Sequence, residues 1–104
     1  MGGISYNKEE EVFAKEIYQT LVSPSLELGS QNMIKQYAVT HTFGSTDVGD
    51  LTWLVPTGGF RTATWVPGTA AHSWQAVASG GTSIGLKGAK LAAEVLTNSA
   101  KDIF

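Results

Sequence analysis

The chain has 104 residues, the length of one small domain, and we expect residues 1–104 to form a single domain. It is 42% hydrophobic and 15% charged, which excludes a disordered chain. The net charge is −2, and the seven lysines and arginines form no cluster, so we expect no nucleic-acid partner.

The first predicted element is an amphipathic helix at residues 8–22. Its apolar residues recur every four positions, at Phe13, Ile17 and Leu21. Asn7 can cap this helix, and Glu10 stands three positions later, as in a capping box. Pro24 ends the pattern, because the residue before a proline avoids helical geometry.

Three short segments rich in β-branched and aromatic residues are predicted strands. They are 37–43 (YAVTHTF), 51–56 (LTWLVP) and 60–66 (FRTATWV). Polar stretches with glycines separate them and predict turns. The sequence PGTAAHSWQ that follows the third segment predicts a loop.

The last predicted element is a helix from about Thr82 to Asn98. Gly85, Gly88 and Ala92 form a stripe of small residues on one side of it. Glycine disfavours a helix interior by about 1 kcal/mol relative to alanine, so the stripe predicts close approach to another backbone, which we expect to belong to a sheet. The element order predicts an α/β fold, with a small sheet of about three or four strands flanked by an N-terminal and a C-terminal helix.

Two carboxylates in the turn GSTDVGD are candidate functional groups. Asp47 and Asp50 lie between two predicted strands, where paired carboxylates could hold a metal, orient a ligand or transfer protons. The alternative is structural, because Ser45, Thr46 and Asp47 can hydrogen-bond to their own backbone, as turn residues commonly do.

His72 is the second candidate. A neutral imidazole is a common metal ligand, and the small residues around it would let a ligand approach. A metal site needs at least three protein ligands, however, and the chain offers only His72, His41 and its carboxylates. A histidine packed into a turn therefore remains the alternative. The three tryptophans could likewise line a pocket or fill a core.

Together these segments resemble the C-terminal part of zinc-dependent amidohydrolases and peptidases of the aminoacylase and glutamate-carboxypeptidase type. Within that group they are most similar to the aminobenzoyl-glutamate utilization protein B branch. Two stretches carry the resemblance, GSTDVGDLTWLVPT and TATWVPGTAAHSWQAVASGGTSIGLKGAKLAAEVL, and EEEVFAKEIYQTL adds a weaker match. The resemblance implies a partial catalytic domain, similar to the C-terminal lobe of a two-lobed metallopeptidase.

The resemblance also implies roles for individual residues. His72, in GTAAHSW, matches a metal ligand of the complete enzyme. The residues expected at the rim of the site are Gly44, Ser45, Thr46, Asp47, Asp50, Gly68, Thr69 and Ser73. The metal would be zinc or another divalent ion, and most of its ligands would come from a part of the enzyme that this chain lacks. No catalytic residue is expected in the chain, which would be inactive and bind no metal by itself.

We therefore expect a C-terminal fragment of an amidohydrolase that cleaves an amide bond of an acyl or aminobenzoyl amino acid. The alternative is a non-enzymatic subunit or interaction module that keeps the fold without catalysis. The expected partner is the missing N-terminal half of the catalytic domain or a second copy, because isolation would expose apolar surface. We expect a cytoplasmic protein without a membrane partner, since the chain has no cysteine, no signal peptide and no long apolar run.

Overall fold

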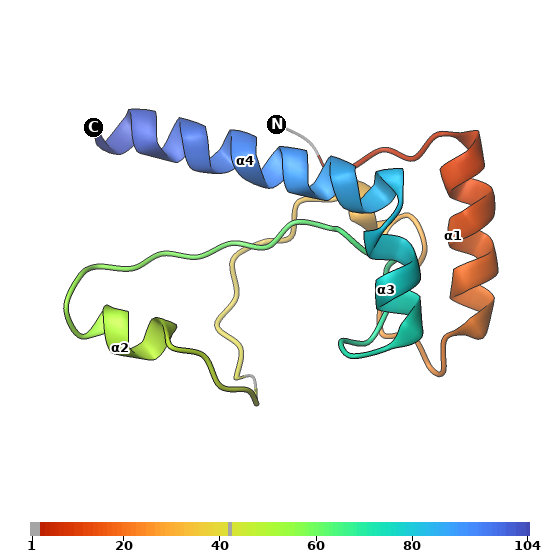
Figure 1. Cartoon of the computed structure of the whole chain (residues 1–104), viewed down its shortest axis with the longest axis horizontal. Coiled ribbons are helices and arrows are strands. Elements are labelled where there is room, and N and C mark those ends of the chain that lie inside the picture. Colours follow the sequence, from red (N-terminus) through yellow and green to blue (C-terminus); the bar gives the residue numbers. More distant parts are fainter. Residues whose placement is uncertain (1–2, 42) are drawn as a thin grey trace.

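The computed structural model describes residues 3–41 and 43–104 of the chain. Over these residues the fold is helical and contains no strand (Figure 1). The elements in chain order are α1 (Lys8–Thr20), the short 3-10 helix η1 (Ser30–Asn32), α2 (Val48–Thr52), α3 (Trp74–Gly80) and α4 (Ser83–Ile103).

The predicted α/β fold with a small sheet is therefore wrong. Residues 37–41, Phe43 and residues 60–66 lack regular secondary structure, and the second predicted strand contributes Leu51 and Thr52 to α2. Thr42 lies outside the described residues. β-branched and aromatic residues favour an extended backbone, but a strand also needs a neighbouring strand to accept and donate its hydrogen bonds. Across the described ranges these segments find no such neighbour.

Helix α1 forms as its sequence predicts. The Asn7 side chain accepts a hydrogen bond from the Glu10 backbone N–H, and the Glu10 carboxylate accepts one from the Asn7 backbone N–H, both at 2.8 Å. This capping box satisfies two donors at the helix start that have no partner within the helix. The helix ends at Thr20, with Leu21 as its C-cap, and buries Ala14 and Ile17.

Helix α4 begins directly after its predicted start and ends at Ile103, five residues beyond the predicted end. Its glycines make the predicted close approach, although not to a sheet. A Cβ atom on Gly85 would collide with the Gly80 carbonyl at the end of α3, and one on Gly88 would collide with the Ala63 carbonyl. The Thr62 hydroxyl also donates to the Gly88 carbonyl at 3.0 Å. Extended chain and a helix end thus occupy the place expected for a sheet.

The core is small and lies where α1, α3 and the N-terminal end of α4 meet. Its buried apolar residues are Ile4, Ala14, Ile17, Val66, Ala76 and Ile84. Partly buried side chains pack around it, namely Tyr6, Phe13, Tyr18, Leu28 and Ala78. The C-terminal half of α4 extends away from this core (Figure 1). None of the helices within the described ranges is both long enough and apolar enough to span a bilayer.

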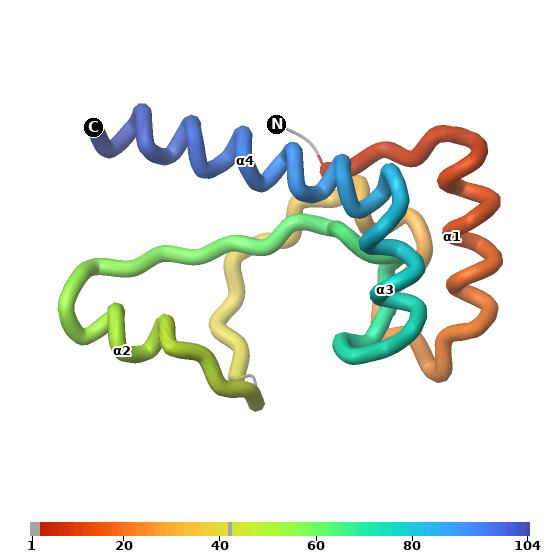
Figure 2. The backbone as a smooth tube through the Cα atoms, viewed as in Figure 1, coloured from red at the N-terminus to blue at the C-terminus, as the bar shows by residue number. Residues whose placement is uncertain are grey.

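Residues 33–60 leave the core as a long excursion, which we call the arm. The chain runs outward, forms α2 at the far end and returns below α4 (Figure 2). Every described residue of the arm is exposed, and the hydrogen bonds of these residues are local. The radius of gyration is 15.3 Å, whereas a compact chain of this length has about 13 Å.

Candidate functional site

His72 lies in the turn that precedes α3 and is exposed. Its backbone has a φ of 59°, in the left-handed region that non-glycine residues seldom adopt. The side chain borders an open hollow of about 440 Å³. The other residues that line this hollow are Trp65, Ser73, Trp74, Ala76 and Val77. An imidazole at the edge of an open, largely apolar hollow is accessible to a ligand or to another polypeptide.

The residues around His72 fix the shape of this turn. Gly68 has a φ of 86°, and a Cβ atom there would lie 2.6 Å from the Pro24 Cβ. The Thr69 hydroxyl donates to the Val66 carbonyl at 2.7 Å. The Ser73 hydroxyl donates to the Ala70 carbonyl and accepts from the Ala76 N–H, which caps α3. Gly68, Thr69 and Ser73, all expected at the site rim, thus hold the turn that presents His72.

The acidic turn lies in the arm. Asp47 is the N-cap residue of α2 but its side chain makes no capping hydrogen bond, and Asp50 lies in the first turn of the helix. The Thr46 hydroxyl accepts a hydrogen bond from the Val48 N–H at 3.4 Å. Gly44 and Ser45 are exposed in the extended stretch before the helix. All residues of this turn, 44–50, are therefore exposed to solvent.

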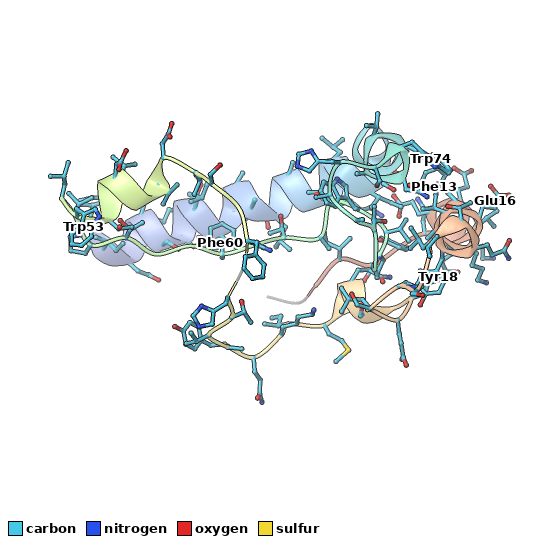
Figure 3. All side chains as sticks on the ribbon, turned by 90° about the horizontal axis from the view of Figure 1, so that it is seen from below. Phe13, Glu16, Tyr18, Trp53, Phe60 and Trp74 are labelled. Carbon is cyan, nitrogen blue, oxygen red and sulfur yellow. The ribbon has the colours of Figure 1, made fainter. Side chains whose placement is uncertain are left out.

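The structure does not bring the acidic turn to His72. Trp53, directly after α2, and Trp74, at the start of α3, lie at opposite ends of the molecule (Figure 3). Across residues 3–41 and 43–104, no three histidine or acidic side chains are grouped closely enough to hold a metal ion. His41 is exposed in the arm. Within the described ranges, His72 is therefore accessible but lacks the neighbouring carboxylates that would complete a metal site.

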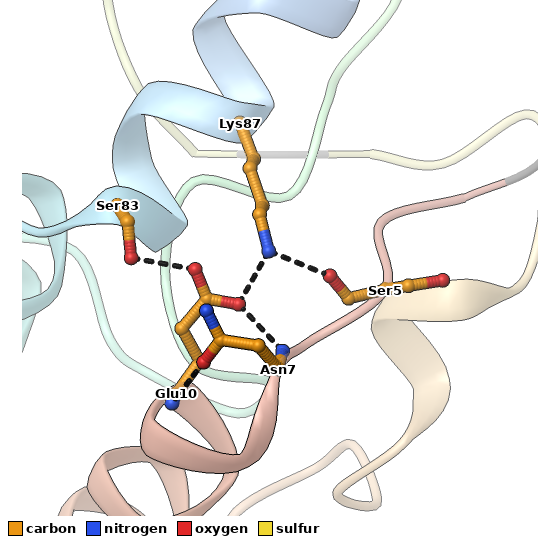
Figure 4. Close-up of polar contacts among 5 residues, drawn as sticks. All are labelled: Ser5, Asn7, Glu10, Ser83 and Lys87. Carbon is orange, nitrogen blue, oxygen red and sulfur yellow. Dashed lines mark hydrogen bonds and ion pairs between the residues drawn. The ribbon is translucent and has the colours of Figure 1, made fainter.

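A second polar cluster joins α1 to α4 around the buried Glu10 (Figure 4). The Glu10 carboxylate is 4% exposed and accepts hydrogen bonds from the Ser83 hydroxyl and the Lys87 ammonium, both at 2.5 Å. Lys87 also donates to the Ser5 carbonyl at 3.0 Å. Together with the Asn7 N–H, these donors use both oxygens of the Glu10 carboxylate.

The cluster keeps Glu10 ionised. Burial by itself would raise the pKa of the carboxyl, but hydrogen bonds from Lys87, Ser83 and Asn7 outweigh it and lower the pKa from 4.5 to about 2. Burial, with the negative charge of Glu10 nearby, raises the pKa of the Tyr6 hydroxyl to about 12. The arrangement is that of a structural ion pair, because Glu10 is enclosed and fully hydrogen-bonded.

Two of these features were missed by sequence reasoning. The pairing of Glu10 with Lys87 joins residues 77 positions apart, and no local pattern indicates such a contact. The predicted loop at residues 67–75 includes the first two residues of α3, and the rest of that helix is not predicted, although Ser73 before WQAVAS is a recognisable helix start. A search for N-cap residues downstream of Pro67 could have found it.

Comparison with known proteins shows that this chain is similar to part of a larger protein. No family model matches the chain, and no solved structure matches it. The chain is 30% identical, over an alignment of 128 positions, to a component of the p-aminobenzoyl-glutamate hydrolase of Escherichia coli (strain K12). The alignment covers 99% of this chain and 27% of that protein. The whole chain is therefore similar to about a quarter of a hydrolase.

Proposed function

We propose that this chain is the C-terminal part of a metal-dependent amidohydrolase and that His72 is one of the metal ligands of the complete enzyme. The reaction is hydrolysis of an amide bond in an acyl or aminobenzoyl amino acid. Similarity to a protein named as an aminobenzoyl-glutamate hydrolase supports this substrate class. We place the enzyme in the cytoplasm, in keeping with a chain that has no cysteine.

The observation that carries the proposal is the position of His72. Its imidazole is accessible at the border of an open hollow, and a turn held by Gly68, Thr69 and Ser73 presents it there. A nitrogen ligand suits zinc. The described residues nevertheless supply one candidate ligand and cannot hold the ion by themselves. The other ligands and the catalytic groups then come from the part of the enzyme that this chain lacks, and this chain alone is inactive.

Zinc binding tests the proposal. The chain is purified alone and after co-expression with the portion of the E. coli relative that has no counterpart here, and the zinc content of each preparation is measured. We expect zinc to be retained only in the mixture. His72→Ala should weaken retention at least about 100-fold, since loss of an outer-shell partner alone weakens metal affinity by about 10- to 100-fold.

A second histidine provides the matched control. His41 is also exposed but lies in the arm, so His41→Ala should leave zinc retention unchanged. Equal retention by the His72→Ala variant and the unaltered chain would contradict the proposed role of His72.

The alternative function is a non-enzymatic interaction module. The exposed arm favours it, because a surface rich in accessible apolar side chains suits association whether or not a metal is present. Stable complexes that contain no zinc in any combination would favour this alternative.

A further inference from the structure

The hollow beside His72 has two tryptophans in its wall. Trp65 is 37% exposed and Trp74 is 61% exposed, and both line the hollow, whose volume is about 440 Å³. Pockets for small molecules typically have volumes of about 300–1,000 Å³ and are lined mainly by apolar and aromatic side chains. The size and the lining of this hollow therefore suit a small organic group with an apolar face.

The two indoles are held by neighbouring structure. The indole nitrogen of Trp65 lies beside the end of α3, 3.8 Å from the position that a Cβ atom of Gly80 would take. Trp74 is the first residue of α3, and the Ser73 hydroxyl caps that helix by accepting a hydrogen bond from the Ala76 N–H at 3.2 Å. Ala76 lines the hollow and is buried, so α3 rests on the core at this point. The hollow is thus part of the folded body of the protein and not of the arm.

The charge of the lining decides which half of the proposed substrate fits. Among the described residues that line the hollow there is no lysine, arginine, aspartate or glutamate. The amino-acid half of an acyl amino acid carries a carboxylate, which would leave water here without a lysine or arginine to pair with. An aromatic acyl group carries no charge, and its ring gains stacking contact with an indole that an aliphatic group of the same size does not gain. The lining therefore favours an aromatic acyl group.

The rest of the enzyme is the other candidate to fill the hollow. His72, the proposed metal ligand, borders the hollow. A catalytic zinc site keeps one coordination position open for water or substrate. A polypeptide segment packed into the hollow would take up space that the substrate needs beside that metal. With His72 in its proposed role, a small substrate group is therefore the better occupant.

We propose that the hollow is the binding site for the aromatic acyl group of the amide substrate, with Trp65 and Trp74 in contact with the ring. The amide bond then lies toward the border that His72 forms. The identity of the ring as part of a substrate rests on the proposed function, whereas the affinity of the hollow for an aromatic ring depends on this chain alone. The two tryptophans thus set a preference for aromatic over aliphatic acyl groups.

Nuclear magnetic resonance of the full chain tests the site, because each tryptophan gives its own indole N–H signal. Single substitutions by leucine assign the signals of Trp53, Trp65 and Trp74. The probe is p-aminobenzamide, an uncharged aromatic amide that represents the acyl half of the proposed substrate. We expect the Trp65 and Trp74 signals to shift with a dissociation constant on the order of 1 mM, as is usual for a small ring in an open site. The Trp53 signal should stay in place.

Two further probes separate aromatic binding from other causes. Cyclohexanecarboxamide has nearly the same size as the aromatic probe but no π-system, and should bind at least about 5-fold more weakly. Free glutamate represents the amino-acid half of the substrate and should leave all the indole signals unchanged, because the lining offers its carboxylates no lysine or arginine.

Matched variants locate the site. Trp74→Leu keeps an apolar side chain but removes the indole, and should weaken binding of p-aminobenzamide about 10-fold, as read from the Trp65 signal. Trp53→Leu makes the same change in the arm, at the opposite end of the molecule (Figure 3), and should leave binding unchanged. Circular dichroism confirms that both variants keep their helices.

The proposal is overturned if p-aminobenzamide does not shift the Trp65 and Trp74 signals up to its solubility limit. Equal binding of the two amides, a comparable shift with glutamate, or unchanged binding by Trp74→Leu would overturn it as well. None of these measurements involves zinc. Failure of the aromatic site therefore leaves the metal role of His72 standing, and zinc retention that does not depend on His72 would remove that role while leaving the aromatic site in place.

Discussion

The core and the arm use similar residues to opposite effect. Ile84 in α4 is completely buried, whereas Ile34 in the arm is 72% exposed. Both residues are isoleucines in segments with apolar neighbours, so residue type does not distinguish them. The difference is that helices α1 and α3 meet α4, while the arm meets no other described element. Apolar sequence therefore gives stability only where the chain supplies a second surface.

Replacing an isoleucine with alanine in the core and in the arm should give the largest difference in the free energy of unfolding. Ile84→Ala removes a fully buried side chain from a small core and should lower the free energy of unfolding by about 4 kcal/mol. Ile34→Ala should change it by less than about 0.5 kcal/mol. Urea denaturation at a concentration where the chain is monomeric measures both. Comparable losses would show that the arm is packed in solution.

Two adjacent glutamates of α1 allow a buried and an exposed carboxylate to be compared within one helix. Glu10→Gln removes the anion that faces Lys87 and should destabilise the chain by about 3 kcal/mol, whereas the exposed Glu11→Gln should have little effect. The folded pKa of Glu10 is about 2, below its value of 4.5 without these contacts. Its stabilising contribution is therefore fully present above pH 4.5 and is lost as the pH falls towards 2.

The dependence of stability on the ionisation of Glu10 can be measured separately. Acid titration of the free energy of unfolding should show a loss of about 3 kcal/mol across that window, at about 1.4 kcal/mol for each unit of pKa shift. The Glu10→Gln variant should lose this part of the acid sensitivity, and Glu11→Gln should keep it. Identical titration curves for the two variants would show that the buried pair does not form.

Replacing either of two helical glycines with alanine should give the smallest changes in stability, and the two changes should have opposite sign. Gly88→Ala places a Cβ atom against the Ala63 carbonyl and should destabilise the chain by about 2 kcal/mol. Gly49→Ala in α2 meets open space and should be neutral or slightly stabilising, because alanine favours a helix. Thermal unfolding followed by circular dichroism compares them. A stabilised Gly88→Ala variant would show that α4 does not approach residues 63–64 this closely.

The sequence predicts the parts of this structure that depend on near neighbours. The capping box of Asn7 and Glu10 and the start of α4 at Thr82 follow from residues within one helical turn, and both are confirmed. Gly85 and Gly88 correctly predicted a close backbone approach. They could not predict which backbone approaches, because a glycine removes a side chain without specifying its neighbour.

Features that join distant residues could not be predicted in this way. Strand-like composition at residues 37–43, 51–56 and 60–66 predicted a sheet, but pairing depends on a partner segment that composition does not identify. The Glu10–Lys87 pair likewise depends on how α1 and α4 meet. The assignment of His72 as a metal ligand rests on resemblance and remains a prediction, as do the rim roles of Asp47 and Asp50.

The left-handed backbone at His72 has a consequence for how the sequence can change. A side chain in that conformation carries a steric penalty that glycine avoids. Selection for folding alone, for example in a library scored by resistance to protease, should therefore enrich glycine at position 72. Selection for a retained imidazole would instead keep histidine at position 72. The relative frequencies of histidine and glycine after selection therefore show whether folding or the imidazole is the stronger constraint on the turn.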